Sequence, residues 1–162
     1  MKKFTPVLLA ALLLFSAPAW AAVGTCTQTL ETIRMDIQGD PFQKILTFTC
    51  TGGTAGDAGT YAATAISTAY VNNLKGWYLY KVITNPGAVN PNAWGFTLLD
   101  SDAIDVLGGA GAGRHATNSE MFAPLLTSGV YYAQPLLGTW TLTITGNTTA
   151  SAVVVVNFVF VR

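Results

Sequence analysis

Charged side chains are scarce in this sequence. Lys, Arg, Asp and Glu make up 10% of the 162 residues, and the formal net charge is zero. Without a run of basic side chains the chain has nothing to follow a phosphate backbone, so we do not expect it to bind nucleic acid. A surface with so few charges also offers little repulsion between copies, which favours a homo-oligomer or binding to an assembly partner.

Catalytic groups are equally scarce. The chain has one histidine, His115, and no Gly-x-Ser-x-Gly sequence of the kind that presents a nucleophilic serine. A hydrolase would have to combine His115 with Ser101, Ser119 or Ser128, and no catalytic motif surrounds any of these serines. We therefore expect no enzyme activity, assign no catalytic residues, and interpret His115 as a loop residue.

The N-terminus has the pattern of a signal peptide. Two lysines precede an apolar run at residues 7–15, and Ala19-Trp20-Ala21 places small side chains where a signal peptidase cleaves. This pattern predicts a signal peptide at residues 1–21, because the apolar run is too short to span a membrane. The mature chain, residues 22–162, is then a single domain without a membrane span, exported to the periplasm, the cell surface or the extracellular medium.

Cysteine occurs only twice, at Cys26 and Cys50, both in the predicted mature chain. An even number of cysteines in an exported chain predicts a disulfide, and two separately buried thiols are the alternative. Closing a loop of about 25 residues would stabilise the fold by about 3 kcal/mol. A metal site is not expected at these cysteines, because no second pair of soft ligands accompanies them.

Alternation of apolar and polar residues is the dominant pattern in the mature chain. It occurs at residues 139–145 (TWTLTIT), 46–50 (LTFTC) and 32–37 (TIRMDI). A period of two residues is typical of β-strands that bury one face and expose the other. These three segments are therefore predicted to be strands.

Four other segments are less regular. Residues 77–83 (WYLYKVI) and 153–161 (VVVVNFVFV) are apolar on both faces, which predicts central strands or strands in a subunit interface. Residues 60–69, rich in Ala and Thr, fit either a strand or a loose helix. Residues 117–120 (TNSE) have the spacing of a helix capping box, although Pro124 would end any helix within two turns.

Shorter strand candidates lie at residues 94–99, 104–107 and 130–133, with turn-forming Asn, Pro and Gly between several of the strands. About eight or nine short strands in one domain predict an all-β fold. The architecture that fits best is an antiparallel β-sandwich, of which a jelly roll is one form.

Three carboxylates fall within six residues, at Asp100, Asp102 and Asp105. Carboxylate oxygens are preferred ligands of Ca²⁺, which is available outside cells, so these residues form a candidate metal site; no other cofactor is expected. The segment does not match an EF-hand loop. An acidic turn joining two strands is the alternative interpretation.

Glycine is concentrated at residues 108–114 (GGAGAGR). A phosphate-binding loop would need Lys and then Ser or Thr after the last glycine, whereas Arg114 and His115 follow here. A dinucleotide fingerprint would need a βαβ unit, which the predicted strands do not provide. We expect the glycines to allow positive φ angles or close backbone packing.

Aromatic side chains in the predicted strands and loops are candidates for a platform on which sugar rings stack. In strands, however, aromatic residues more often belong to the core or to an interface, so no ligand-binding residue is assigned. The residues concerned are Trp77, Tyr78, Tyr80, Trp94, Tyr131, Tyr132 and Trp140.

A series of short motifs follows from about residue 75 to residue 162. They are KVITNPG (81–87), FTLLDSD (96–102), IDVLGG (104–109), GAGR (111–114), NSE (118–120), GTWTLTI (138–144) and the terminal valine-rich strand. In this order they resemble a family of small β-rich proteins encoded among bacteriophage structural genes. The resemblance implies a virion-associated role and no known catalytic or ligand residues. The signal peptide and the disulfide depart from that family and indicate a cellular relative or an exported viral protein.

Two functional hypotheses follow. The first is a non-enzymatic exported structural or interaction protein that self-assembles or decorates a surface, such as that of a virion. The alternative is an extracellular ligand- or carbohydrate-binding module, with Ca²⁺ held by Asp100, Asp102 and Asp105. A pilin completed by strand exchange is a further idea, but the C-terminal Arg162 replaces the aromatic end expected there.

Overall fold

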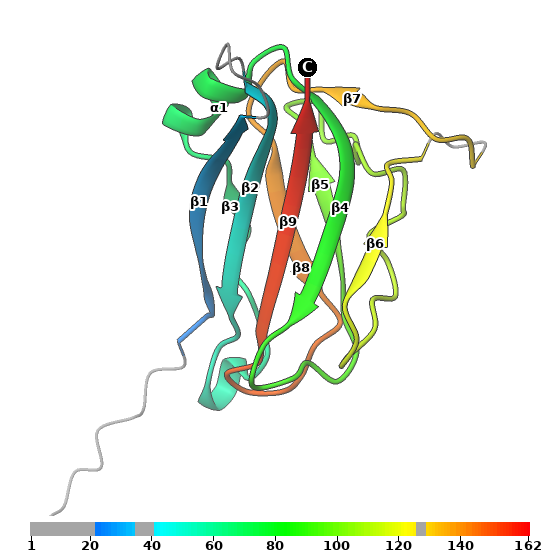
Figure 1. The fold of residues 1–162 in the computed structure, drawn as a ribbon. Helices are drawn as coiled ribbons and strands as arrows, with labels where there is room; N and C mark the ends of the chain where they lie inside the picture. Colours follow the sequence, from blue (N-terminus) through cyan, green and yellow to red (C-terminus); the bar gives the residue numbers. More distant parts are fainter. Residues whose placement is uncertain (1–21, 35–40, 126–128) are drawn as a thin grey trace, which may run out of the picture.

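The computed structural model describes residues 22–34, 41–125 and 129–162. Their strands form two antiparallel sheets, and the structure is mostly β (Figure 1). The predicted signal peptide at residues 1–21 lies outside the described residues, as do the second half of the 32–37 segment and Ser128.

The strands and helices take the following bounds. The strands are β1 (Thr25–Arg34), β2 (Pro41–Thr51), β3 (Thr64–Ala65), β4 (Tyr78–Pro86), β5 (Gly95–Leu99), β6 (Glu120–Phe122), β7 (Gln134–Pro135), β8 (Thr141–Thr145) and β9 (Val153–Val161). The helical segments are the 3-10 turn η1 (Ala55–Asp57) and α1 (Thr68–Leu74). Nine strands in the described ranges confirm the predicted β-sandwich, while the narrower jelly-roll form stays a prediction.

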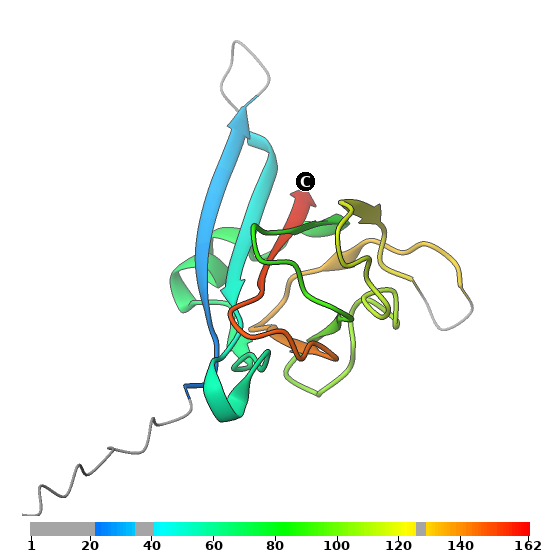
Figure 2. The same ribbon diagram turned by 90° about the horizontal axis from the view of Figure 1, so that it is seen from below.

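The larger sheet has the order β1-β2-β9-β4-β6, with β7 also paired to β4, and the smaller sheet has the order β3-β8-β5. β9 lies between β2 and β4, so the prediction that residues 153–161 form a central strand is confirmed. β1 and β2 form a long antiparallel pair along one side of the molecule (Figure 2).

The core lies between the inner faces of the two sheets. Alternate residues of β2 and β9 are fully buried, and the rings of Phe48 and Phe158 meet edge to face at 5.7 Å. The smaller sheet contributes Leu142 and Ile144, while the ring of Trp140, next to β8, lies 6.2 Å from the Phe160 ring in a tilted arrangement. The alternation in the sequence therefore marks the faces that pack, because side chains of a strand alternate between its two sides.

Several short segments differ from prediction. Residues 104–107 and 130–133 form only isolated bridges, Leu99 with Asp105 and Leu125 with Tyr131, so their prediction as strands was wrong. The TNSE segment runs into strand β6 rather than a helix, because residues 120–122 pair with β4. The Ala- and Thr-rich segment at residues 60–69 was predicted to be either a strand or a helix. It contains strand β3 and the start of helix α1.

Helix α1 is short and is held by its ends. The Ser67 hydroxyl accepts the N–H of Tyr70 as an N-cap, and Leu74 is fully buried. At the other end the Lys44 ammonium donates to the carbonyl of Asn73 at 2.6 Å and lies over the Trp77 ring. Local sequence propensity alone would not form a helix of this length, so these tertiary contacts position it.

One buried hydroxyl in β4 lacks a hydrogen-bond partner among the described residues. Thr84 is fully buried, and its Oγ1 has no acceptor or donor in reach. We expect Thr84→Val, which keeps the side-chain shape and removes the unpaired hydroxyl, to raise the free energy of unfolding by about 1 kcal/mol in urea denaturation.

Thr47→Val is the matched control for this substitution. The Thr47 hydroxyl donates to Oδ1 of Asn157 at 2.7 Å, so its removal is expected to lower stability by about 1 kcal/mol. A loss of stability in Thr84→Val as large as that in the control would mean that the Thr84 hydroxyl has a partner in solution.

Candidate functional site

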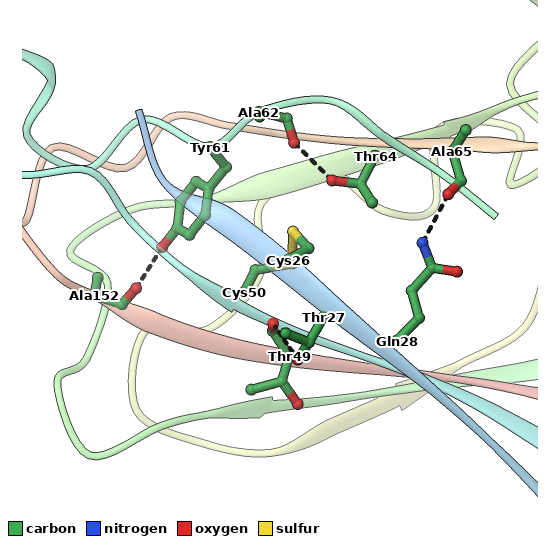
Figure 3. Close-up of a disulfide and its surroundings, with 10 residues drawn as sticks. All are labelled: Cys26, Thr27, Gln28, Thr49, Cys50, Tyr61, Ala62, Thr64, Ala65 and Ala152. Atoms are coloured by element: carbon green, nitrogen blue, oxygen red, sulfur yellow. Dashed lines mark hydrogen bonds between the residues drawn. A yellow bond between two sulfur atoms is a disulfide. The ribbon is translucent and has the colours of Figure 1, made fainter. Parts of the chain in front are cut away.

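The predicted disulfide is present and joins the edge strand β1 of the larger sheet to its neighbour β2. Cys26 and Cys50 lie directly opposite each other in β1 and β2, with an S–S distance of 2.02 Å and a Cα–Cα distance of 4.0 Å (Figure 3). Near it, the Gln28 side chain donates to the carbonyl of Ala65 and accepts the N–H of Ser67. These contacts attach β1 to β2 on one side and to the start of α1 on the other.

A buried polar network lies at the same end of the sandwich. The Tyr61 hydroxyl donates to the carbonyl of Ala152 at 3.1 Å (Figure 3), and burial raises the pKa of Tyr61 to about 12. The amide of Asn147 donates to the carbonyls of Gly59 and Thr149 and accepts the N–H of Thr149. Each group is satisfied within the loops, so this network holds the loops together.

The three aspartates of the candidate calcium site lie in a turn after β5. Asp100 accepts the N–H groups of Asp102 and Ile104, both at 2.9 Å. Asp105 accepts three N–H groups, from Leu98, Leu107 and Gly109. Two of the three carboxylates therefore stabilise the turn itself.

Within residues 22–34, 41–125 and 129–162, no three His, Cys, Asp or Glu side chains are grouped so that they could hold a metal ion. Ca²⁺ binding by Asp100, Asp102 and Asp105 thus stays a prediction, and the geometry gives it no added support. The acidic-turn interpretation accounts for the hydrogen bonds of Asp100 and Asp105.

The glycine-rich segment packs closely against its neighbours. A Cβ added to Gly108, whose φ is +60°, would lie 1.9 Å from the carbonyl oxygen of Leu125. A Cβ on Gly111 would lie 2.2 Å from the carbonyl oxygen of Phe96. The expectation of positive φ angles and close backbone packing is confirmed.

His115 lies on the surface at the end of this segment. Its Nδ1 accepts the N–H groups of Thr117 and Asn118 at 3.1 and 3.0 Å, so the imidazole ring closes a turn in the backbone. No serine in the described part of the chain is hydrogen-bonded to it, and Ser128 lies outside that part. The geometry supports the interpretation of His115 as a loop residue.

The aromatic residues separate into two groups. The tryptophans Trp77, Trp94 and Trp140 are buried in the core. The tyrosines of the same candidate platform are all exposed: Tyr78, Tyr80, Tyr131 and Tyr132. The tryptophans are thus unavailable to a ligand, and any aromatic contact with a partner falls to the tyrosines.

Two of the exposed tyrosines, Tyr80 and Tyr131, line a groove at one edge of the larger sheet. The groove has a volume of about 420 Å³ and is lined by Tyr80, Lys81, Met121, Phe122, Ala123 and Tyr131. We refer to these six residues as the tyrosine groove. Of the eleven large apolar side chains exposed in the described ranges, six come from β4, β6 and residues 130–132, so exposed apolar surface is concentrated here.

Two strands and one loop build the groove. β4 has an irregularity between Leu79 and Lys81, which turns both Tyr80 and Lys81 away from the core. The Tyr131 hydroxyl donates to the carbonyl of Tyr80 at 3.1 Å, and the two rings meet edge to face at 6.1 Å. Partial burial raises the pKa of Tyr131, and the neighbouring Tyr80 adds to the effect.

The far side of the groove is anchored by β6. Met121 pairs with Ile83 of β4 and is 66% exposed, the most exposed side chain of the groove. The Phe122 ring lies under the guanidinium of Arg114 at 4.5 Å. Sequence analysis missed Met121 and Phe122, because the helix-like pattern before them gave no signal of an exposed strand edge.

A second hollow, of about 480 Å³, lies beside β5. The rings of Trp94 and Phe96 that border it are almost fully buried, and the Arg114 guanidinium at its edge donates to the carbonyl of Ala112. The exposed side chains at this hollow are small or polar, among them Asn92 and Thr145. The tyrosine groove, where Tyr80, Met121 and Tyr131 are exposed, has the more apolar lining and is the better candidate for binding a protein.

No protein-family model matches the chain, and no curated protein or solved structure matches it either. In the described ranges, no helix is both long and apolar enough to cross a membrane. The function must therefore be inferred from the chain's own surface.

Proposed function

We propose that this chain is an exported, non-enzymatic structural or interaction protein, which self-assembles or decorates a surface through the tyrosine groove. The observation that carries the proposal is the gathering of exposed Tyr80, Met121 and Tyr131 around one concave site. Tyrosine and methionine are enriched at protein interfaces, where Lys, Glu and Asp are depleted.

The charges near the groove support a protein partner. Lys81 is the one charged residue among the six that line it, and the nearby Arg114, over the Phe122 ring, is paired with Glu120 at 3.8 Å. A partner surface that is equally apolar loses little solvation energy when it docks here, whereas a strongly charged ligand finds few opposite charges.

A carbohydrate fits the same groove less well. Sugar sites combine an aromatic ring with several polar side chains that fix the hydroxyl groups. Here the Tyr131 hydroxyl already donates to the Tyr80 carbonyl, which leaves the Tyr80 hydroxyl and Lys81 as the other polar side-chain groups beside three apolar residues. The groove therefore favours a protein surface over a glycan.

The disulfide is compatible with export, since such bonds persist in oxidising compartments. Together with the signal-peptide pattern of residues 1–21, it supports a periplasmic, cell-surface or extracellular location. The resemblance of residues 75–162 to phage structural proteins supports a virion as one such surface.

The test is the mass and assembly state of the protein recovered from the exported fraction without reductant. We expect a chain that begins at Ala22 and is two hydrogens lighter than the dithiol, which mass spectrometry measures. Light scattering after size-exclusion chromatography is expected to give a species larger than one chain, or gradient sedimentation to place the protein with particles or envelopes.

Two results would contradict the proposal. One is a strictly monomeric protein at high concentration that is also absent from every particle and envelope fraction. The other is strong binding of a purified glycan with no protein partner, which would favour the carbohydrate-binding alternative.

A further inference from the structure

A small pocket lies at the end of the sandwich where β9 ends. It has a volume of about 210 Å³ and is formed by the turn after β5, by β7 and by the residues between β7 and β8. Both β7 and the end of β9 pair with the first residues of β4, which places them together (Figure 1). We refer to this cavity as the Trp140 pocket, after the one aromatic residue of its lining, and it shares no residue with the tyrosine groove.

The indole N–H of Trp140 is an unused hydrogen-bond donor in this pocket. Trp140 is 3% exposed, and its N–H makes no hydrogen bond with the described residues, whereas that of Trp94 donates to the carbonyl of His115 at 3.1 Å. Thr84 Oγ1 is the one fully buried side-chain N or O atom that lacks a partner among those residues, so the Trp140 N–H is not fully buried and meets solvent. Buried tryptophans usually have an acceptor for this group, and the pocket is where a ligand can supply one.

The opposite chemistry comes from the turn after β5, which contributes two carboxylates to the lining. Asp100 accepts the N–H groups of Asp102 and Ile104 through one oxygen, Oδ1, while the Asp102 carboxylate accepts no hydrogen bond from the described residues. An ionised carboxylate can only accept, whereas Ser101 and Gln134, which also line the pocket, can both donate and accept. The pocket therefore combines a fixed donor with anionic acceptors and has no Lys or Arg in its lining.

This mixture discriminates between classes of ligand. An anion would face two carboxylates and no basic side chain. A cation such as an ammonium group suits the carboxylates but cannot accept from the Trp140 N–H, which would stay unpaired when the ligand covers it. A hydroxyl group donates to a carboxylate and accepts from an N–H at the same time. A ligand with several neighbouring hydroxyl groups thus satisfies every polar group of the pocket.

We propose that the Trp140 pocket binds a single sugar unit of a neutral glycan, whose hydroxyl groups accept from the Trp140 N–H and donate to Asp102. Drug-sized ligands occupy about 300–1,000 Å³, so the smaller volume here suits one hexose ring. Pro135 and Leu137 line the pocket and supply apolar contacts for the C–H groups of that ring. The inference goes beyond the proposed function and does not rest on it, because the pocket and the groove are separate.

The walls of the pocket are held in place by the fold. The N–H of Leu136 donates to the carbonyl of Trp77, and the carbonyl of Trp140 accepts the N–H of Ile66. A preformed site loses less conformational entropy on binding, but one hexose still makes few contacts, so we expect a dissociation constant in the millimolar range. Such weak binding differs from the strong glycan binding that would contradict the proposed function.

The indole N–H signals in a nitrogen–proton correlation spectrum test the pocket directly. The chain has four tryptophans, and without Trp20 of the predicted signal peptide three remain. We would titrate methyl glycosides of glucose, galactose, mannose and N-acetylglucosamine to about 100 mM, well above the expected dissociation constant. At least one glycoside is expected to shift the Trp140 signal saturably and to leave that of Trp94, which already has an acceptor, in place. No shift of the Trp140 signal with any of them would overturn the inference.

Two substitutions locate the bound sugar. Asp102→Ala removes a carboxylate acceptor and is expected to raise the dissociation constant at least about 10-fold. Asp57→Ala is the matched control, because Asp57 lies in η1 and lines neither the pocket nor the groove. Gly138→Leu is expected to abolish binding by filling the pocket, and a Cβ added at Gly138 meets no atom within 4 Å, so the fold can accept it. Equal binding in the two aspartate variants, or binding that survives in Gly138→Leu with an unchanged circular dichroism spectrum, would contradict the proposed site.

Calcium chloride and methylammonium chloride are the competing probes. If either shifts the Trp140 signal while no glycoside does, the pocket is a cation site and the inference is wrong. Gly138→Leu is expected to leave the assembly state in light scattering unchanged, because the tyrosine groove contains none of the pocket's residues. Loss of sugar binding in that variant is therefore measured separately from the proposed function.

Discussion

Replacing Asn147 with aspartate is expected to lower the free energy of unfolding by about 3 kcal/mol or more at pH 7. Asn147 is 8% exposed, and its Nδ2 donates to the carbonyls of Gly59 and Thr149 at 3.1 and 3.0 Å. A carboxylate cannot donate, so Asn147→Asp would place a buried negative charge against two carbonyl oxygens. Urea denaturation measures the loss.

The acceptor side of the Asn147 amide is unchanged by this substitution. Oδ1 of Asn147 accepts the N–H groups of Asn92 and Thr149, and an aspartate would keep both contacts. The loss therefore isolates the donor side of the network. The control is Asn90→Asp, which makes the same chemical change at an exposed position in the loop between β4 and β5. It is expected to alter the free energy of unfolding by less than about 0.5 kcal/mol. Equal effects in the two variants would show that the Asn147 network does not contribute.

The strands that form the core could be predicted from the sequence, because burial and strand geometry produce the same two-residue period. Leu142 and Ile144 are buried and alternate with less buried threonines, as the pattern of residues 139–145 predicted. The disulfide was also predictable, since a chain with two cysteines allows one pairing.

The short elements depend on contacts that are distant in sequence. Glu120 has the position of a capping-box glutamate, yet its carboxylate binds the N–H of His115, and its strand forms because β4 offers Val82 to Thr84 as partners. Helix α1 likewise depends on Lys44, which comes from β2. Local patterns do not encode such partners, so they predicted the wrong element or left two alternatives open.

The tyrosine groove was out of reach of sequence reasoning for the same reason. Tyr80 and Tyr131 are 51 positions apart and meet only after β4 and the loop beyond β6 are in place. A list of aromatic residues could not separate the buried tryptophans from the exposed tyrosines, because both types occur in segments whose pattern predicts strands. Their separation requires knowing which face of β4 is covered by the smaller sheet.

Removing the disulfide is expected to lower the free energy of unfolding by about 3 kcal/mol. The bond closes a loop with a sequence separation of 24 residues, and cross-linking such a loop restricts the unfolded chain. The double variant Cys26→Ala, Cys50→Ala measures this in urea without reductant. Thr27→Ala, Thr49→Ala is the control, because the two threonines are the next pair in the same register and are exposed.

The same bond links stability to the compartment in which the protein folds. A small domain has about 5–15 kcal/mol of stability in total, so a loss of 3 kcal/mol is a large share. Reductant added to the unmodified protein is expected to bring it to the stability of the double variant and to leave that variant unchanged. If reductant has no effect once the thiols are shown to be free, the two paired strands hold β1 without the bond. If it does have the expected effect, β1 keeps its full anchorage only where disulfides persist, which is the environment that the signal peptide predicts.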